Sequence, residues 1–373
     1  MPDVTYRLFF NDEAASQEQL NRVEEITVEQ RIDAAWEARL QIPVCLDENG
    51  NWQGDDEDFM ISYSAVRVEI KIADQTYQAL IDGPVVGFDT QRSSEPGQSS
   101  ITLIVHDDSA FLNQEEALSR FDNMADHEVA QQLFGGVARI GVIDVETTPD
   151  HTGGLPAVIV QRGTGMQILR TLARRQGMHA YVLPGEDPGQ SVGCFKRLPA
   201  AAGDIPDLVI LGAERNVSGF NLSNNAQSPA QVQASALRVT DKGVVTRTSS
   251  FRDLDLLGDQ QAQQTDSSVA TMIALPRFGT GVDLDRLVEG QSERASYAYS
   301  ATGSIIGECY SGVLLPYNLV NVTGTSDEAC GEYLIHQVRH QLTRSVYGQS
   351  FTLKRNARSS TGGGSSASAG SIY

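Results

Sequence analysis

The sequence predicts a mainly β fold into which a small α+β unit is inserted. Apolar and polar residues alternate with a period of two in the N-terminal and C-terminal parts of the chain, as they do on half-buried strands. Helical spacing of apolar residues is found instead in the middle, from about residue 115 to about residue 200. Short strands separated by regular turns are typical of a β-barrel or a β-sandwich.

Residues 26–44 carry the longest alternating pattern. Apolar side chains such as Ile26, Val28 and Leu40 share one parity, and mainly Thr, Glu, Arg and Asp occupy the other. This pattern predicts a half-buried strand, or a strand pair that bends in the middle. A helix is the alternative for residues 32–40, which are rich in Ala, Glu and Arg.

Alternation returns at residues 66–72, and short apolar runs predict three further strands, at residues 77–81, 84–88 and 101–105. An acidic segment that contains Gly, residues 47–58, lies between the first two strand regions and predicts a solvated hairpin connection. A calcium loop is the alternative, but that motif needs Gly at its sixth position, where this chain has Trp52.

The first predicted helix covers residues 126–134. We expect the Asp126 carboxylate to cap the free amides of its first turn. We expect Gly135 to close the helix in a left-handed conformation.

The second predicted helix begins after Thr164 and ends at Gly177. Residues 178–183 then predict a strand, which completes the α+β unit. The apolar stripe of this helix consists of Ile168, Leu169, Leu172 and Ala173.

The C-terminal part returns to strands and ends in a tail of low complexity. Short apolar runs predict strands at residues 208–211, 236–239 and 244–248, and a charged, Ala-containing stretch predicts a helix over residues 284–299. Residues 314–358 form the last ordered piece. From Ser359 onward the chain is mainly Ser, Gly, Ala and Thr, which predicts a flexible tail.

The composition excludes several classes of protein. Lys and Arg number 28 against 48 Asp and Glu, so the formal net charge is −20, which argues against a basic nucleic-acid-binding face and against docking on anionic lipid. The N-terminus carries no secretion signal, and the apolar runs are far shorter than the roughly 20 residues of a membrane span. The four cysteines form no metal-binding pair and are expected to be buried free thiols.

A search for catalytic patterns identifies no candidate site. The sequence has no nucleophile elbow, no phosphate-binding loop and no dinucleotide fingerprint. His336 and His340 would share a metal only on a helix; on the hairpin that their flanks predict, they lie about 13 Å apart at roughly 3.3 Å per residue. Paired carboxylates are expected to be solvated charges: Asp55 with Asp56, Asp107 with Asp108, and Asp283 with Asp285. We therefore predict no catalytic, cofactor-binding or metal-binding residue, which favours a structural or assembly role.

A set of residues near the C-terminus resembles the closing hairpin of the phage late-control D and tail hub family, which includes the hub part of the valine-glycine-repeat spike proteins. Residues 121–130, 161–178 and 305–322 resemble the short helix, the helix-then-strand segment and the pre-hairpin strands of that family. The hairpin residues that fit the family order are Gly331, Tyr333, His340, Tyr347, Phe351, Arg355 and Asn356.

The resemblance implies trimers in which each chain carries two tube-like β-barrel domains and a small inserted α/β domain. Three chains then present six barrels to a sixfold tail tube on one side and a threefold spike on the other. The implied domains are a first barrel at residues 1–115, an α+β insertion at 116–205, a second barrel with the closing hairpin at 206–358, and a flexible tail at 359–373.

The implied function is that of a baseplate hub, a structural adaptor in a contractile phage tail or injection system, and not that of an enzyme. Its implied partners are two further copies of the chain, an inner tube protein, a separate spike protein and other baseplate components, without a cofactor, a membrane anchor or direct nucleic-acid sequence recognition. The protein would be made in the cytoplasm and assembled into the baseplate, with its excess negative charge around a channel. The alternatives are a tail-associated peptidoglycan hydrolase that uses carboxylates and a β-rich carbohydrate-binding protein, although aromatic residues make up only 7% of the chain.

Overall fold

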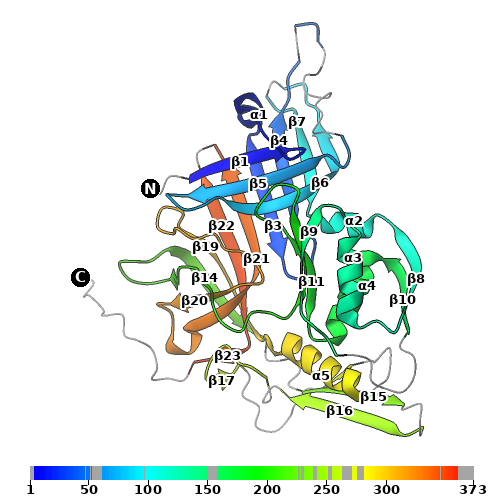
Figure 1. The fold of residues 1–373 in the computed structure, drawn as a ribbon. Coiled ribbons are helices and arrows are strands. Elements are labelled where there is room, and N and C mark those ends of the chain that lie inside the picture. Colours follow the sequence, from blue (N-terminus) through cyan, green and yellow to red (C-terminus); the bar gives the residue numbers. More distant parts are fainter. Residues whose placement is uncertain are drawn as a thin grey trace.

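The prediction of a mainly β fold is confirmed (Figure 1). The computed structural model describes residues 4–46, 48–50, 52, 61–95, 97–149, 158–225, 227, 231–237, 242–250, 254–262, 271–274, 281–344 and 346–359. Most of the acidic segment 47–58 and all of the tail after Ser359 therefore lie outside the described residues. Within the described ranges, no helix is long and apolar enough to cross a membrane.

The largest part of the fold is a run of eight antiparallel strands within one large sheet. Strand β21 pairs with β3 and so joins the C-terminal part of the chain to the N-terminal part. In spatial order the eight strands are β14 (Val217–Asn224), β19 (Tyr299–Ile305), β22 (Tyr347–Arg355), β21 (Gly331–Thr343), β3 (Glu25–Arg31), β4 (Glu37–Pro43), β7 (Ser100–His106) and β6 (Gln78–Gln91).

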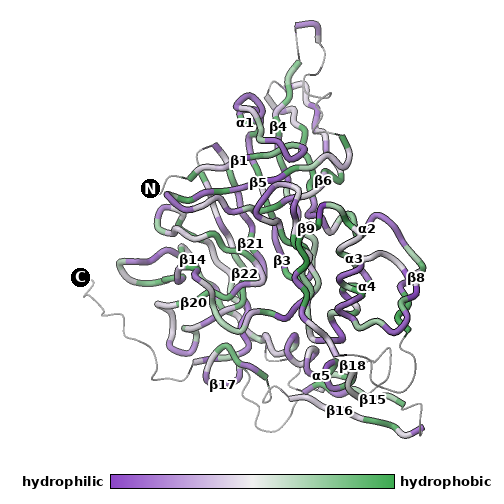
Figure 2. Tube along the Cα trace, in the orientation of Figure 1, coloured by the Kyte–Doolittle hydropathy of each residue, from purple (hydrophilic) through white to green (hydrophobic). Residues whose placement is uncertain are grey.

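Residues 26–44 form the antiparallel pair β3 and β4, so the strand-pair prediction is confirmed and the helix alternative is wrong. The predicted strands at residues 77–81 and 84–88 are one strand, β6. This strand changes partner along its length, because residues 78–84 pair with β5 (Ala65–Ile72) and residues 85–91 pair with β7, with an irregular register between Val85 and Gly87. The N-terminal part is completed by β1 (Val4–Phe10), β2 (Glu13–Ala14) and helix α1 (Gln17–Arg22), which is mainly hydrophilic (Figure 2).

Apolar residues of these strands form the largest core. Each strand contributes alternate side chains, so the pattern seen in the sequence becomes a buried layer. A second core lies among the C-terminal strands, which include β13 (Leu208–Val209) and β20 (Leu319–Thr323). This part of the chain also contains a short 3₁₀ helix (Asp327–Ala329) and the strand pair β17 (Gln260–Gln261) and β23 (Ala357–Arg358). The hairpin predicted around the two histidines is confirmed as β21 and β22.

The predicted α+β unit follows β7 in the chain and has its own core. Its strands form two small sheets, and α4 shows both hydrophilic and hydrophobic residues (Figure 2). Its elements are α2 (Ser109–Asn113), β8 (Glu116–Asp122), α3 (Asp126–Gly135), β9 (Ile140–Val145), β10 (Val158–Thr164), α4 (Gly165–Arg175), β11 (His179–Leu183) and β12 (Ser191–Lys196).

The start and end of α4 match the prediction, but those of α3 do not. Thr164 caps α4, and Gly177 follows it with φ +67°. In α3 the capping position belongs to Ala125, whose amide donates to the Glu128 side chain at 2.7 Å. The Asp126 carboxylate instead accepts a hydrogen bond from Arg175 Nε at 2.6 Å, and the helix continues through Gly135. The predicted roles of Asp126 and Gly135 are therefore wrong.

A second α/β unit lies between β14 and β19 in the chain. The three strands β15 (Gln231–Leu237), β16 (Val244–Ser250) and β18 (Thr271–Ala274) form a sheet, and helix α5 (Gly281–Ser296) packs on it around a small fourth core. The helix ends at Ser296, three residues before the predicted end, because Tyr299 already opens β19. The limits proposed above for the domains stay predictions.

Candidate functional site: a polar sheet face and the ion networks around it

The eight-stranded run has one face made of polar side chains, which we call the polar face. It consists of the outward side chains of these strands. On β21, only the residues from His336 to the end of the strand belong to it. Three rows of cross-strand neighbours on it are Ser304–Ser350–Arg339–Glu29–Glu37–His106, Gly348–Gln341–Thr27–Arg39–Ile104–Gly87, and Thr343–Glu25–Gln41–Thr102–Asp89.

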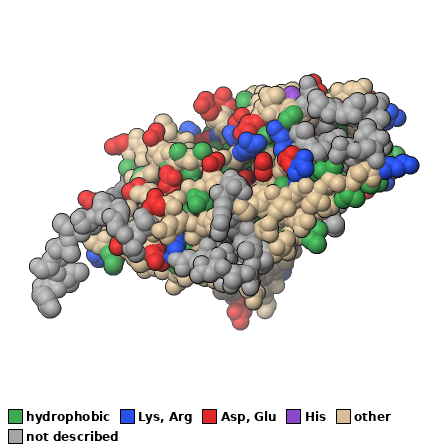
Figure 3. All heavy atoms as spheres, turned by 90° about the horizontal axis from the view of Figure 1, so that it is seen from below, with side chains coloured by type: hydrophobic (Ala, Val, Ile, Leu, Met, Phe, Trp, Pro, Cys, Tyr) green, Lys and Arg blue, Asp and Glu red, His purple; other side chains and the backbone are tan. Residues whose placement is uncertain are grey.

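Charges on the polar face are balanced. It carries four carboxylates, on Glu25, Glu29, Glu37 and Asp89, and four cations, on Arg31, Arg39, Arg339 and Lys354. Several form ion pairs across strands: Arg39 Nη1 lies 3.9 Å from Asp89, and Arg339 Nε lies 3.7 Å from Glu29. The net charge of −20 is therefore carried by other surfaces. On the face seen from below, acidic side chains are scattered over the left part, and basic ones lie mainly towards the middle and right (Figure 3).

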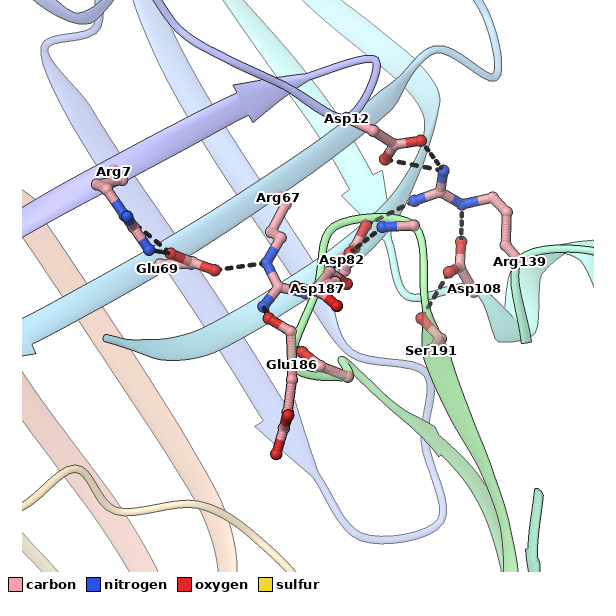
Figure 4. A network of polar contacts seen from close by, with 12 residues as sticks. Arg7, Asp12, Arg67, Glu69, Asp82, Asp108, Arg139, Glu186, Asp187 and Ser191 are labelled. Atoms are coloured by element: carbon pink, nitrogen blue, oxygen red, sulfur yellow. Dashed lines mark hydrogen bonds and ion pairs between the residues drawn. The ribbon is translucent and has the colours of Figure 1, made fainter. Parts of the chain in front are cut away.

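A buried ion network connects the N-terminal strands to the inserted α+β unit (Figure 4). Its centre is Asp82 on β6, which is fully buried. One carboxylate oxygen accepts from Arg67 Nη1 at 3.0 Å, and the other accepts from Arg139 Nη2 at 2.6 Å. Arg139 precedes β9 and also donates to Asp108 at 2.9 Å.

Arg67 extends the network on both sides. Its guanidinium donates to Glu69 Oε1 at 2.7 Å and to the carbonyl oxygens of Gly185 and Glu186, at 2.8 and 2.9 Å, in the β11–β12 loop. One buried arginine therefore holds a loop of the inserted unit against β5 by donating to its backbone. Such a network fixes orientation, because removing one partner leaves an uncompensated buried charge.

Burial shifts the pKa values of the acids in this network. Burial raises the pKa of Asp108 to about 6, against the lowering effect of Arg139 and of the hydrogen bond from Ser191. Burial likewise raises the pKa of Asp82, although Gly189, Arg139 and Arg67 all favour its charged form. Burial lowers the pKa of Arg139, but its acidic partners Asp108 and Asp82 outweigh that effect and raise it overall.

A second junction forms around Asp33, in the turn between β3 and β4. The ring of His179, from β11, donates to Asp33 at 2.8 Å, and Arg294, from α5, donates at 2.5 Å. Burial alone would raise the pKa of Asp33, but its interactions with His179 and with the Arg294 guanidinium hold it well below its usual value. Both α/β units are thus attached to the same turn of the large sheet.

The family-like hairpin residues have structural roles. His340 is buried on the inner side of β21, where its Nδ1 accepts from the Tyr347 hydroxyl at 2.9 Å and its Nε2 donates to Gln30 at 3.1 Å. The Gln30 amide in turn donates to the carbonyl of Leu80 at 2.7 Å. Burial lowers the pKa of His340 to about 3, so the ring is neutral.

Arg355 and Asn356 fasten the end of β22 to neighbouring loops. The buried Arg355 guanidinium donates to the carbonyls of Leu257 and Cys330, at 2.9 and 2.8 Å, and lies 5.2 Å from the centre of the Tyr333 ring. A Cβ on Gly331, which has φ +129°, would lie 2.5 Å from this guanidinium. The Asn356 side chain accepts from the amide of Leu257 at 2.9 Å.

Several sequence expectations about chemistry-bearing residues are wrong. Asp107 and Asp108 are buried acceptors and not solvated charges: Asp107 accepts from the amides of Trp36 and Ser109 at 2.5 and 2.9 Å. Asp285 does lie at the surface, where it pairs with Arg247, whereas Asp55, Asp56 and the side chain of Asp283 lie outside the described residues. Cysteines are free, but only Cys194 is buried, and Cys45 and Cys309 are exposed.

No sequence pattern predicts that Arg67 pairs with Asp82, or that Arg139 pairs with Asp82 and Asp108, because these partners lie 15, 57 and 31 residues apart. The two histidines of the hairpin lie on a strand, as predicted, with His340 facing the core. No group of three or more His, Cys, Asp or Glu side chains within the described ranges is arranged to hold a metal ion.

Comparison with known proteins shows the fold. No family model matches the chain, and no curated protein matches it. Among solved structures, the tail protein from Neisseria meningitidis MC58 is similar with a TM-score of 0.64 at 14% identity, over 95% of this chain and 96% of that one. The 43 kDa tail protein of prophage MuSo2 from Shewanella oneidensis is similar with a TM-score of 0.65 at 14% identity, over 95% and 99% of the two chains.

An E. coli component of the type VI secretion system, described as structurally similar to the T4 bacteriophage tail proteins gp27 and gp5, has a TM-score of 0.53 at 11% identity. The alignment covers 95% of this chain and 76% of that chain. The structural neighbours are thus phage tail proteins and a type VI secretion component, and the chain shares their fold.

Proposed function

We propose that this chain is a tail hub: a structural, non-enzymatic protein that forms a trimer and joins a sixfold inner tube to a threefold spike in a contractile phage tail or injection system. The observation that carries the proposal is the eight-stranded antiparallel run with its polar face. It consists of two four-stranded halves, β14–β19–β22–β21 and β3–β4–β7–β6, joined by the β21–β3 pair. Three copies would offer six such halves, which matches a sixfold tube.

The ends of this run favour contact between copies. Among the described residues, β14 pairs only with β19, and residues 87–91 of β6 pair only with β7. Edge strands offer unpaired backbone groups to another chain. Apolar side chains lie near both edges, because Phe88 on β6 is 51% exposed and Leu222 on β14 is 38% exposed. Because the two edges are different surfaces, a contact between them is heterologous and builds a closed ring when the rotation closes.

The polar face would then line the channel. Its Ser, Thr and Gln side chains, with carboxylates and cations in equal number, offer no large apolar patch and no net charge to a passing cargo. The four carboxylates of the polar face are matched by four cations, so this proposal places the excess acid of the chain elsewhere than on the polar face.

The proposal is tested by measuring the mass of the purified chain in solution by light scattering, alone and with an inner tube protein of a contractile system. We expect a species of three times 40.4 kDa that binds the tube protein. Phe88→Glu with Leu222→Glu should abolish the trimer, whereas Leu118→Glu, on the 81% exposed side chain of β8, should leave it intact. A chain that stays monomeric in both conditions would overturn the proposal. A lytic band on a peptidoglycan zymogram would favour the hydrolase alternative instead.

A further inference from the structure

One end of the polar face differs from the rest in its charges. Arg31 ends β3, His336 lies on β21, and Lys354 lies on β22, so three basic side chains occupy adjacent strands. The carbonyl of His336 accepts from the amide of Ile32 at 3.0 Å, which places His336 directly beside the end of β3. Gln337 is the cross-strand neighbour of Arg31. We call these three residues the cationic end.

A β-bulge places His336 on the same side of the sheet as Arg31 and Lys354. The register between β21 and β22 shifts between Ile335 and Gln337, so His336 is the extra residue. Because a bulge places two successive side chains on one side of the sheet, His336 and Gln337 both belong to the polar face. Lys354 follows the inward Leu353 and therefore points to the same side.

Within the part of the chain that the structure describes, none of the three side chains has an acidic partner. No hydrogen bond or ion pair joins them to a described side chain, whereas Arg39 and Arg339 on the same face are each paired with a carboxylate. The nearby Asp33 is already engaged by His179 and Arg294. Acids are not scarce, because the chain has 48 of them against 28 Lys and Arg. The unpaired cations are therefore a local arrangement and not a result of composition.

The pKa values support this description. Burial and the neighbouring Arg31 lower the pKa of Lys354. Burial, Lys354 and Arg31 lower the pKa of His336 to about 4, although the Asp33 carboxylate acts in the opposite direction. Each cation thus makes the charged form of its neighbours less favourable, and a bound anion would relieve that repulsion.

We propose that Arg31, His336 and Lys354 form a docking site for an acidic, extended segment of a protein partner, whose carboxylates pair with the two permanent cations. The dimensions fit. Adjacent strands are about 4.8 Å apart, so the site spans about 10 Å across β22, β21 and β3. Same-side carboxylates in an extended segment repeat every ~6.6 Å, which flexible Arg and Lys side chains can span.

The surrounding charge favours a protein segment over a nucleic acid. Glu29 lies two residues from Arg31 on the same side of β3, and Glu25 and Glu37 lie on the same face. A regular phosphate backbone that crossed the site would run against these carboxylates, whereas a peptide can restrict its acidic side chains to the cationic end. Arg31 also has a planar guanidinium, which can donate two parallel hydrogen bonds to one carboxylate.

The test uses the full chain and a fluorescent oligoglutamate peptide, with binding followed by anisotropy at low and at physiological salt. We expect saturable binding that weakens as salt screens the charges. Arg31→Gln and Lys354→Gln should each weaken binding about tenfold, which is the loss of one charge-assisted hydrogen bond. Arg339→Gln is the matched control, because it removes a cation of the same face that already has a partner, and it should change binding less than about twofold.

A second measurement reports on the site directly. The NMR titration of His336 should shift to a higher pKa when oligoglutamate is bound, and this shift should be absent with oligolysine or inorganic phosphate. Three outcomes would overturn the proposal: absence of oligoglutamate binding at low salt, an equal effect of Arg339→Gln, or preferential binding of single-stranded DNA of equal charge. None of them concerns the mass of the assembly, so this result is separate from the test of the proposed trimer.

Discussion

Arg139 donates a 2.6 Å hydrogen bond to the fully buried carboxylate of Asp82, and this contact joins the inserted α+β unit to β6. The same guanidinium also donates hydrogen bonds to Asp108 and Asp12. Because Asp82 and Asp108 are fully buried, water cannot replace Arg139 as their partner.

Replacing Arg139 by Gln should destabilise the protein by about 3–5 kcal/mol, because Asp82 and Asp108 would lose their shared cation while remaining buried. Urea unfolding at neutral pH measures this change. The control is Arg120→Gln, whose pair with Asp122 is exposed and should be worth less than about 1 kcal/mol. Equal losses in both variants would contradict the structural role of the network.

Gly83 on β6 is predicted to tolerate no side chain. A Cβ there would lie 2.1 Å from the carbonyl oxygen of His106, which is backbone and cannot turn aside. We expect Gly83→Ala to cost about 1–3 kcal/mol or more, measured as a drop in Tm. Gly87→Ala in the same strand is the matched comparison, because nothing lies within 4 Å of its Cβ, and its Tm should stay close to that of the natural chain.

The stability of the chain should fall in mild acid because of His340. Its pKa is about 3 in the folded protein and 6.5 in the unfolded chain, so the unfolded state binds the proton first as pH falls below 6.5. Between pH 6.5 and pH 5 this residue alone should remove about 2 kcal/mol of unfolding free energy. His340→Gln should show a smaller loss over the same interval in urea titrations. A variant whose loss equals that of the natural chain would show that His340 is not the responsible group.

Arg355 is expected to be indispensable for the C-terminal core. Arg355→Met would leave the carbonyl of Leu257 without its side-chain donor, at about 1–3 kcal/mol for the group left unsatisfied. It would also remove one of two donors to the carbonyl of Cys330, which would keep the hydrogen bond from the Ser359 hydroxyl. Thermal unfolding and limited proteolysis of residues 254–262 would measure the loss. Arg339→Met, whose guanidinium is 52% exposed, should be close to neutral in the same assays.

Local pattern was sufficient to predict β3 to β7 and the closing hairpin of β21 and β22, but it predicted no strand at β1, β8 or β14. Tertiary contacts also overrode local pattern at several polar side chains. The alternation in residues 26–44 predicted β3 and β4 because one side of each strand is buried. Asp126 has the residue type and position of a helix cap, but Arg175, 49 residues away, binds its carboxylate instead. Similarly, Asp107 and Asp108 look like surface charges in sequence, and only the folded chain brings Arg139 and the Trp36 amide to them.

The polar face was only half predictable. Local sequence pattern predicts six of its strands, β3, β4, β6, β7, β21 and β22, but neither β14 and β19 nor the order of the strands. The pairing of β21 with β3 joins residues about 310 positions apart, for example His340 with Val28, and no local pattern encodes such a contact. The bulge at His336 is equally invisible, because it depends on register and not on residue type.

The β21–β3 pair has a mechanical consequence. It extends over seven residue pairs, from Gln337 with Arg31 to Thr343 with Glu25, so the two halves of the run share one ladder of hydrogen bonds. A force along the strands that slides one half past the other loads all these bonds together in shear, and no single bond can break first. The joint would therefore resist such a force as a stiff plate and not as a hinge.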